Sequence, residues 1–403
     1  MINPSISQIV VIGGGQAGGW ACKTLRDEGF TGTLTVVADE PHDFYERPPL
    51  SKAVLAGDEA LPRLFSAATV NDLVIDWRRP QRAVDIDHHV RRVHLDSGEC
   101  LPYDRLLIAT GGKPRLPVAG WAELDSVLTL RSWDDARRLR RCLGQARRLA
   151  VIGGGWIGLE VAASARKLGL EVEVFERQAA LCGRSVGGAV SAALTELHEM
   201  QGVRLHLACE DLGLAEDDAG KLNVTDAEHA LGSFDLAVVG TGVEFDLGLA
   251  RSAGLTTGQG IVVDNDGATS DPHIFAAGDV AQHPVLGFCL QSWAHAQNQA
   301  IVAARGMLGV AGDGYADPAW LWSDQYDTNI QILGIPNADA ECVVREEAQG
   351  RTFFYLDARQ RLSQVVAFNQ PRHIKLAKRW LAAQRVLDPD MLGDPASNLM
   401  SLR

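Results

Sequence analysis

Gly153, Gly155 and Gly158 form a G-x-G-x-x-G pattern, the spacing with which a backbone binds the pyrophosphate of a dinucleotide. The first glycine permits a tight turn, the second lets the backbone approach the phosphates, and the third lets a helix pack closely on a strand. About 20 residues later comes Glu176, an acid that can hold the diol of a ribose. Arg177 follows directly and could accommodate a 2′-phosphate, but the glutamate favours NADH over NADPH.

The same pattern occurs near the start of the chain, at Gly13, Gly15 and Gly18. Asp39 and Glu40 stand where the ribose-binding acid of this unit is expected, and on spacing both are open to that role. The two units lie 140 residues apart, and together they predict two nucleotides bound by one protein.

Two further polar positions are suited to chemistry. Pro48 and Pro49 exclude a helix interior, so that rigid backbone delivers Lys52 at the start of a helix near the first glycine loop. Gly278 and Asp279 follow a short apolar strand, where a fixed carboxylate can accept hydrogen bonds from the hydroxyls of a polyol.

The elements that must position these residues are short apolar runs of the kind that buried parallel strands need. We expect such strands at 34–38, 106–109, 149–152, 172–175 and 274–277. From about residue 315 the chain changes to short strands at hairpin spacing, followed by a helix at about 371–385. The sequence therefore predicts an α/β protein with two Rossmann-like dinucleotide-binding domains and a C-terminal α+β domain.

The predicted domain boundaries follow from these patterns. The first domain is discontinuous, with residues 1–113 and 241–315, and the second covers residues 114–240. Residues 316–403 form the C-terminal domain.

Composition and charge exclude several classes of protein. Hydrophobic residues make up 46% of the chain and there are 41 glycines, which fits an α/β enzyme rather than a disordered or fibrous protein. The formal net charge of −13 argues against nucleic acid or anionic membranes as partners. No apolar run reaches 18 residues and no signal peptide precedes the first strand, so we expect a cytoplasmic protein.

The cysteines argue against thiol chemistry and against a metal site. Seven are scattered along the chain, without a C-x-x-C or C-x-x-x-x-C pair and without metal-ligand spacing to histidine. A disulfide reductase would need a cysteine pair to pass electrons. An NADH oxidase that reduces peroxide or oxygen would need a redox cysteine near residues 42–45, which read His-Asp-Phe-Tyr.

Motifs along essentially the whole chain resemble those of FAD-dependent NADH:ferredoxin reductases with the glutathione-reductase-like fold. This family includes the reductase components of aromatic-ring dioxygenases, putidaredoxin reductase and rubredoxin reductase, and apoptosis-inducing factor is a more distant member. Besides the two glycine loops, the matching motifs are RPPLSK (47–52), YDRLLIATGG (103–112), SDPHIFAAGDVA (270–281), QSWAHAQNQA (291–300) and WLWSDQY (320–326). RPPLSK and WSDQ are specific to this branch.

The resemblance implies FAD in the first domain. The residues that it assigns to FAD are Gly13, Gly15, Gln16, Ala17, Asp39 with Glu40 as the competing acid, Arg47, Lys52, Val84, Thr110, Gly111, Arg131, Gly278, Asp279, Ser292, Trp293 and Ala294. Among them Asp39 would bind the adenosine ribose, Val84 would lie against the adenine, and Asp279 would bind the ribitol.

The resemblance also implies NADH in the second domain. The residues that it assigns there are Gly153, Gly155, Trp156, Ile157, Gly158, Glu160, Glu176, Arg177, Arg184, Thr241 and Gly242. Lys52 and Glu160 are the implied catalytic residues, because an ion pair between them near the nicotinamide could respond to the charge of the flavin. The chain departs from the family at Glu244-Phe245, where Pro-Asn is common.

The function that the resemblance implies is electron transfer from NADH through FAD, in single-electron steps, to a [2Fe–2S] ferredoxin of the Rieske type that feeds an oxygenase, such as an aromatic-ring dioxygenase. Three alternatives remain open: a rubredoxin reductase, a reductase of a P450 ferredoxin, and a redox-sensing interaction protein like apoptosis-inducing factor.

Overall fold

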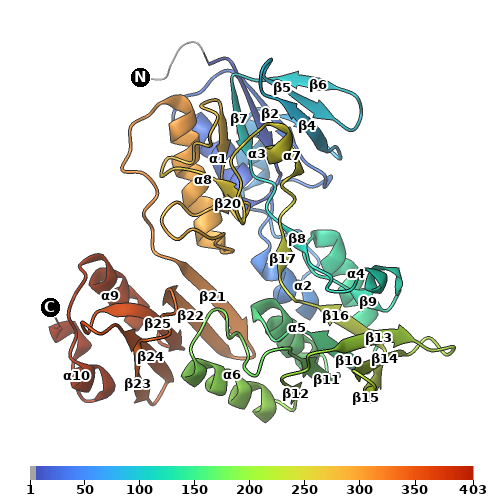
Figure 1. Cartoon of the computed structure of the whole chain (residues 1–403), viewed down its shortest axis with the longest axis vertical. Helices are drawn as coiled ribbons and strands as arrows, with labels where there is room; N and C mark the ends of the chain where they lie inside the picture. Colours follow the sequence, from blue (N-terminus) through green and yellow to red (C-terminus); the bar gives the residue numbers. More distant parts are fainter. Residues whose placement is uncertain (1–5, 403) are drawn as a thin grey trace. The chain divides into compact units, whose positions relative to one another are not determined.

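The computed structural model describes residues 6–402, and the chain divides into two compact units (Figure 1). The first unit consists of Met1–Arg47, Leu61–Lys113 and Val243–Asp317, and the second of Pro48–Ala60, Pro114–Gly242 and Pro318–Arg403. The segment 48–60 and the C-terminal segment thus belong to the second unit. The three predicted domains and their boundaries remain a prediction.

The first unit is built on a five-stranded parallel sheet with the strand order β19-β7-β1-β2-β3. Its strands are β1 Gln8–Ile12, β2 Thr33–Val37, β3 Asp76–Arg78, β7 Arg105–Ile108 and β19 Ile274–Ala276. The predicted strands are present here, with ends that differ from the predicted ones by one residue. The carboxyl ends of β1 and β2 lie beside the first glycine loop, as the sequence requires.

Alternation along β1 explains what covers each face of this sheet. Ile9 and Val11 pack with residues of α1 Gln16–Asp27 and α8 Trp293–Leu308, two helices that lie against each other (Figure 1). Val10 and Ile12 point to the other face, since successive strand residues alternate. That face is covered by an antiparallel sheet and a short helix, namely β4 Ala83–Asp87, β5 Arg92–Leu95, β6 Cys100–Pro102 and α7 Gly248–Ser252.

Shorter elements complete the first unit and the segments at its boundaries. They are α3 Ala67–Asp72, β8 Lys113–Pro114, β17 Val243–Glu244, β18 Ile261–Val262 and β20 Ala281–Gln282.

The second unit repeats this plan with a parallel sheet of the order β12-β11-β10-β16-β9. Its strands are β9 Val127–Leu128, β10 Arg148–Ile152, β11 Glu171–Phe175, β12 Arg204–His206 and β16 Leu236–Val239. One face packs with α4 Trp133–Leu143, α5 Trp156–Lys167 and α6 Gly188–Met200, and the other with β13 Leu212–Glu216, β14 Leu222–Asp226 and β15 His229–Phe234. The short η1 Pro48–Ser51, α2 Ala53–Ala56 and η2 Ala119–Glu123 also belong to this unit.

The C-terminal part of the second unit has the predicted α+β character. Five antiparallel strands follow the order β21-β22-β25-β24-β23, and their bounds are β21 Trp320–Gln325, β22 Thr328–Gly334, β23 Glu341–Glu347, β24 Gly350–Leu356 and β25 Leu362–Phe368. The helix α9 Pro371–Ala382 packs on β22 and β25, and α10 Pro389–Gly393 and η3 Leu399–Ser401 follow it. Ile330, Phe353 and Val366 share one apolar core with Leu159 and Leu194 of α5 and α6, which explains why this part joins the second unit.

Among residues 6–402, no helix combines the length and the apolar character that crossing a membrane demands.

Candidate active site

The first glycine loop joins β1 to α1 and has the shape that a pyrophosphate needs. Gly13 has a φ of 124°, and a Cβ there would lie 2.2 Å from the carbonyl oxygen of Ala109. A Cβ on Gly18 would lie 2.0 Å from the carbonyl oxygen of Gly13. At Gly15 the nearest atom to such a Cβ is a side-chain nitrogen of Arg47, 3.9 Å away. The outer glycines are therefore required by packing, while the middle glycine leaves space for phosphate at the N-terminus of α1.

The two acidic residues after β2 have different surroundings. Glu40 accepts hydrogen bonds from the hydroxyl of Tyr45 (2.6 Å) and from Arg47 (2.9 Å). Burial lowers the pKa of Arg47, but its neighbours Tyr45 and Glu40 outweigh this effect and raise the pKa above its usual value. Asp39 is exposed. Because Glu40 is already engaged by the protein, the geometry supports Asp39 as the residue for the ribose.

The polar residues predicted for the flavin side lie at the ends of β19 and α8. Gly278 follows β19 with a φ of 80°, and Asp279 comes next. Ser292 caps α8 with its side chain. The indole N–H of Trp293 donates to the side-chain oxygen of Gln16, at 3.0 Å, when the Gln16 amide is oriented with its oxygen toward the ring. This hydrogen bond brings together predicted residues of α8 and α1.

The remaining residues predicted for FAD are divided between the two units. Those in the first unit are Ala17, Val84, Thr110, Gly111 and Ala294. The side chain of Val84 is 58% exposed on β4, as expected of an apolar residue that a flat ring would cover. Lys52 and Arg131 belong to the second unit. The structure thus brings most of the predicted FAD residues into one unit.

The second glycine loop repeats the geometry of the first. Gly153 has a φ of 109°, and a Cβ there would lie 2.6 Å from the carbonyl oxygen of Gly240. A Cβ on Gly158 would lie 2.1 Å from the carbonyl oxygen of Gly153. Gly155 again has more room, because the nearest atom to its Cβ position is 3.9 Å away. Both glycine loops therefore have the backbone geometry that a dinucleotide pyrophosphate needs.

Glu176 follows β11, at the edge of the second loop. One carboxylate oxygen accepts the N–H of Gly154 (2.6 Å), and the other accepts the N–H of Gln178 (2.8 Å). A carboxylate oxygen has capacity for more than one hydrogen bond, so each can still accept from a ribose hydroxyl. Arg177 is exposed beside it. This arrangement supports the predicted preference for NADH.

The two units differ in the residue that packs against the glycine between the first two motif glycines of each loop. A Cβ on Gly154 would lie 3.1 Å from the Cβ of Glu176, and a Cβ on Gly14 would lie 2.9 Å from the Cβ of Ala38. Ala38 thus takes the place in the first unit that Glu176 has in the second. Asp39 comes one residue later, which explains why it is exposed instead of bonded to the glycine loop.

The other residues predicted for NADH lie around this loop in the second unit. Trp156 and Ile157 begin α5, and Ile157 is 46% exposed. The indole N–H of Trp156 is buried and has no acceptor within the described part of the chain. Arg184 is exposed, with a guanidinium nitrogen 3.5 Å from the Cβ position of Gly242, and the hydroxyl of Thr241 donates to a neighbouring backbone carbonyl.

The predicted pair Lys52 and Glu160 is present as a buried ion pair. The side-chain nitrogen of Lys52 lies 2.6 Å from Glu160 Oε2, and Glu160 is only 3% exposed. The hydroxyl of Ser51 donates to the same oxygen at 2.5 Å, and the hydroxyl of Ser323 donates to Glu160 Oε1 at 2.6 Å. The segment 48–60 positions Lys52, since η1 ends at Ser51 and α2 starts directly after Lys52.

The sequence prediction missed Ser51 and Ser323. Both lie in the quoted motifs RPPLSK and WSDQ, so the signal was present. They are 109 and 163 residues from Glu160, and no local spacing shows which polar side chain will meet that carboxylate.

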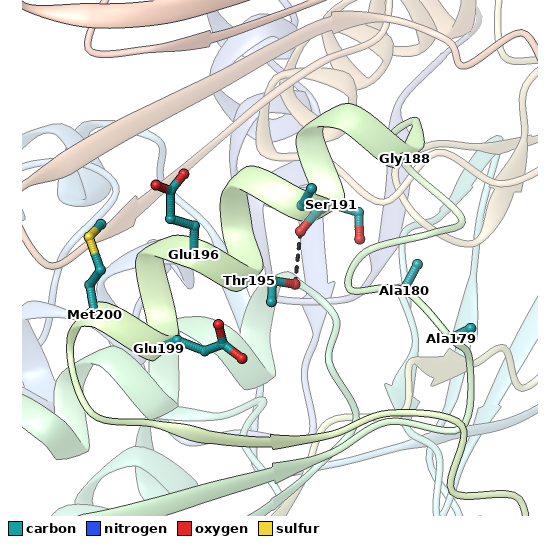
Figure 2. A pocket seen from close by; sticks show the side chains of 9 residues that line it. Ala179, Ala180, Gly188, Ser191, Thr195, Glu196, Glu199 and Met200 are labelled. Carbon is teal, nitrogen blue, oxygen red and sulfur yellow. Dashed lines mark hydrogen bonds between the residues drawn. The ribbon is translucent and has the colours of Figure 1, made fainter.

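Outside these sites the second unit has a shallow groove of about 470 Å³ along α6 (Figure 2). Its lining includes Ala179, Ala180, Ser191, Thr195 and Met200, none of which was predicted to be functional. In residues 6–402, no group of three or more His, Cys, Asp or Glu side chains is arranged to hold a metal ion.

Two families match the chain. Residues 7–300 match the family described as pyridine nucleotide-disulphide oxidoreductase, and residues 320–403 match the reductase C-terminal family.

Similar proteins cover nearly the whole chain. The ferredoxin–NAD(+) reductase component of the anthranilate 1,2-dioxygenase system of Burkholderia cepacia is 39% identical, over 98% of this chain and 99% of that protein. Rhodocoxin reductase of Rhodococcus erythropolis is 36% identical, over 96% and 92%. The putidaredoxin reductase in its covalent complex with putidaredoxin has a TM-score of 0.92 at 31% identity, over 99% and 98%. The ferredoxin reductase for the CYP199A2 system of Rhodopseudomonas palustris has a TM-score of 0.90 at 31% identity, over 98% and 99%.

Proposed function

Because the chain belongs to the pyridine nucleotide-disulphide oxidoreductase family, we propose that it is an FAD-dependent NADH:ferredoxin reductase. The observation that carries this proposal is the pair of glycine loops with matching geometry, each closed at its outer glycines and open at the middle one. Two dinucleotide sites in one chain suit one bound cofactor and one exchanging electron donor. When bound, FAD would supply the conversion between the two-electron hydride of NADH and the single electrons that an iron–sulfur acceptor takes.

The residues of the protein would bind the two nucleotides and stabilise the charge that forms on the flavin. The N-terminus of α1 and that of α5 each present backbone N–H groups to a pyrophosphate. Asp39 would hold the adenosine ribose of FAD, and Glu176 would hold that of NADH. The ion pair of Lys52 and Glu160 would respond to the charge that a bound flavin gains with the hydride, because charges that are largely shielded from water interact strongly.

The electron acceptor is a small ferredoxin. Relatives named as ferredoxin–NAD(+) reductase components of the anthranilate, p-cumate and benzene dioxygenase systems are 39%, 36% and 34% identical to this chain. On that basis we assign a [2Fe–2S] ferredoxin of the Rieske type as the partner and an aromatic-ring dioxygenase as the terminal enzyme. All seven cysteines are free thiols, which supports the cytoplasmic location expected from the sequence.

The test is NADH-driven reduction of cytochrome c by the FAD-loaded protein, with and without added ferredoxin. A Rieske-type [2Fe–2S] ferredoxin is expected to stimulate the reaction strongly. The Glu160→Gln variant serves as a control, because it should bind FAD yet transfer electrons slowly. Failure of every [2Fe–2S] ferredoxin and of rubredoxin to stimulate the native protein would contradict the proposal and favour a redox-sensing interaction protein.

A second acceptor class is favoured by specific relatives. Rhodocoxin reductase and the ferredoxin reductase for the CYP199A2 system match this chain over more than 90% of its length. A ferredoxin of the putidaredoxin type is therefore included in the same assay. A higher rate with this ferredoxin than with the Rieske type would change the assignment of the terminal enzyme, but not that of the reductase.

A further inference from the structure

Within the second unit, a series of hydrogen-bonded side chains, most of them buried, leads from Glu160 to the β21–β22 hairpin. Ser323 Oγ lies 2.6 Å from Glu160 Oε1, and Gln325 Nε2 lies 3.0 Å from Ser323 Oγ. Gln325 Oε1 lies 2.8 Å from His198 Nε2, and His198 Nδ1 lies 3.0 Å from the hydroxyl of Tyr326. Glu160, His198, Ser323 and Gln325 are each at most 3% exposed. Of these contacts, only the one between Ser323 and Glu160 belongs to the ion-pair site described above.

All hydrogen bonds in this series of side chains have the same donor-to-acceptor direction. Gln325 Oε1 can only accept, so the proton of His198 must be on Nε2 and the hydroxyl of Tyr326 must donate to Nδ1. Gln325 Nε2 can only donate, so Ser323 accepts from it and directs its own proton to Glu160. Every hydrogen bond therefore places its positive end toward the carboxylate.

The state of His198 agrees with this direction. Burial lowers the pKa of His198 to about 4, and its hydrogen bond with Gln325 opposes the shift only in part. The ring is thus neutral near pH 7, with one donor and one acceptor nitrogen. A neutral ring is what a head-to-tail series needs, since a doubly protonated ring could not accept from Tyr326.

The two oxygens of Glu160 are held from opposite sides. Ser51 and Lys52 bind Oε2, and Ser323 binds Oε1. The hydroxyl of Ser323 directs its proton to Glu160, because its other partner, Gln325 Nε2, can only donate. These hydrogen bonds therefore fix both the rotamer of Glu160 and the direction in which its carboxylate faces Lys52.

We propose that Ser323, Gln325 and His198 are positioning residues, which hold Glu160 in the orientation that makes its ion pair with Lys52 effective during reduction of FAD by NADH. This proposal rests on the proposed function, because it assumes that Glu160 acts in that step. None of the three is among the residues assigned to FAD or to NADH.

The first test measures reduction of protein-bound FAD by NADH in an anaerobic stopped-flow instrument, which needs no ferredoxin. Ser323→Ala should lower the rate constant at saturating NADH about tenfold, as expected when a buried hydrogen bond to a charged group is lost. The dissociation constant of NADH should change less than about twofold, because uniform binding is untouched. Ser191→Ala is the matched control, since Ser191 is also buried in the second unit, on α6, and lies outside this series.

A double-mutant cycle separates positioning from general damage to the structure. Ser323→Ala should have no further effect in a Glu160→Gln background, because its influence passes through that carboxylate. The proposal would be overturned if Ser323→Ala and Ser191→Ala reduced FAD at the same rate. It would also be overturned if Ser323→Ala lowered the rate constant by the same factor in the native and in the Glu160→Gln background. Absence of any NADH-driven flavin reduction in the native protein would instead contradict the proposed function.

The second test is independent of activity and uses the native protein. In a ¹⁵N spectrum of histidine-labelled protein, His198 should be neutral at pH 7 with its proton on Nε2, and the missing signal of His198→Gln identifies the resonance. A proton on Nδ1, or a doubly protonated ring, would reverse or break the series and overturn the proposal.

Discussion

Replacement of Glu176 by glutamine should weaken the discrimination between NADH and NADPH. Glu176 sits at the edge of the second glycine loop and accepts backbone N–H groups with both oxygens, so its carboxylate is fixed in place. A 2′-phosphate on the adenosine ribose would approach this carboxylate directly. The glutamine keeps the size of the side chain and removes its charge.

The magnitude follows from Coulomb repulsion in a partly solvated site. Glu176 is half-buried, so water screens it and the effective dielectric constant is high. At about 4 Å in water two unit charges repel by about 1 kcal/mol. Because a phosphate carries about two charges at neutral pH, the native protein should prefer NADH by about 2 kcal/mol, or roughly 30-fold in kcat/KM. The variant should also lose about fivefold with NADH, through a weaker hydrogen bond to the diol.

The assay is steady-state reduction of ferricyanide with each coenzyme, which is independent of the ferredoxin. Glu171→Gln is the matched control, because Glu171 is an exposed glutamate at the opposite end of the same strand. A native protein that uses both coenzymes equally well would refute the reasoning. So would a Glu176→Gln variant whose ratio of kcat/KM values stays within about twofold of the native ratio, a difference of only about 0.4 kcal/mol.

Three further outcomes are expected. Gly158→Ala should abolish NADH binding in isothermal titration, because the added Cβ would lie 2.1 Å from a backbone oxygen. Gly188→Ala is the control, since its added Cβ would meet open space. This control should leave the affinity for NADH and the melting temperature nearly unchanged. Acid should destabilise the fold in part through His198, because the unfolded ring takes up a proton near pH 6.5 and the native ring only near pH 4. Unfolding therefore becomes easier as the pH falls through this interval, by up to about 3 kcal/mol for this residue. His198→Gln should reduce the dependence of the melting temperature on pH without removing it, since burial also lowers the pKa of His295. Iodoacetamide should leave NADH-driven activity intact even where it alkylates the partly exposed Cys100, Cys142 and Cys342, because the proposed electron transfer needs no thiol. Cys22 should resist alkylation, since burial raises the pKa of its thiol to about 12. Inactivation in step with alkylation would contradict this prediction.

Local patterns were sufficient to predict the elements that hold the nucleotides. Apolar runs located β2, β7 and β10, and glycine spacing located the loops, because both signals arise from neighbours in the sequence. The position of the ribose-binding acid in the first unit was harder to predict. Ala38 fills the place of Glu176, and only the paired strands show that Asp39 comes one residue later.

The environment of Glu160 could not be derived from local patterns. His198 sits on a helix with an ordinary buried face, and Gln325 belongs to a strand more than 100 residues later. Their contact depends on how the C-terminal sheet packs on α5 and α6, which is a tertiary property. The resemblance to known reductases suggested Lys52 as the partner of Glu160, but it did not point to the other residues.

The path of the chain between the units limits how this protein can be divided. The chain passes from one unit to the other after residues 47, 60, 113, 242 and 317, so that neither unit is a continuous stretch. A ribosome must therefore reach residue 317 before the first unit is complete, and the second unit also needs the segment Pro318–Arg403. Expression of residues 114–242 alone would leave Glu160 without Ser51, Lys52 and Ser323, as an unpaired buried charge. Exchange of coenzyme modules between such reductases should therefore transfer the segment 48–60 and the C-terminal sheet together with the central piece.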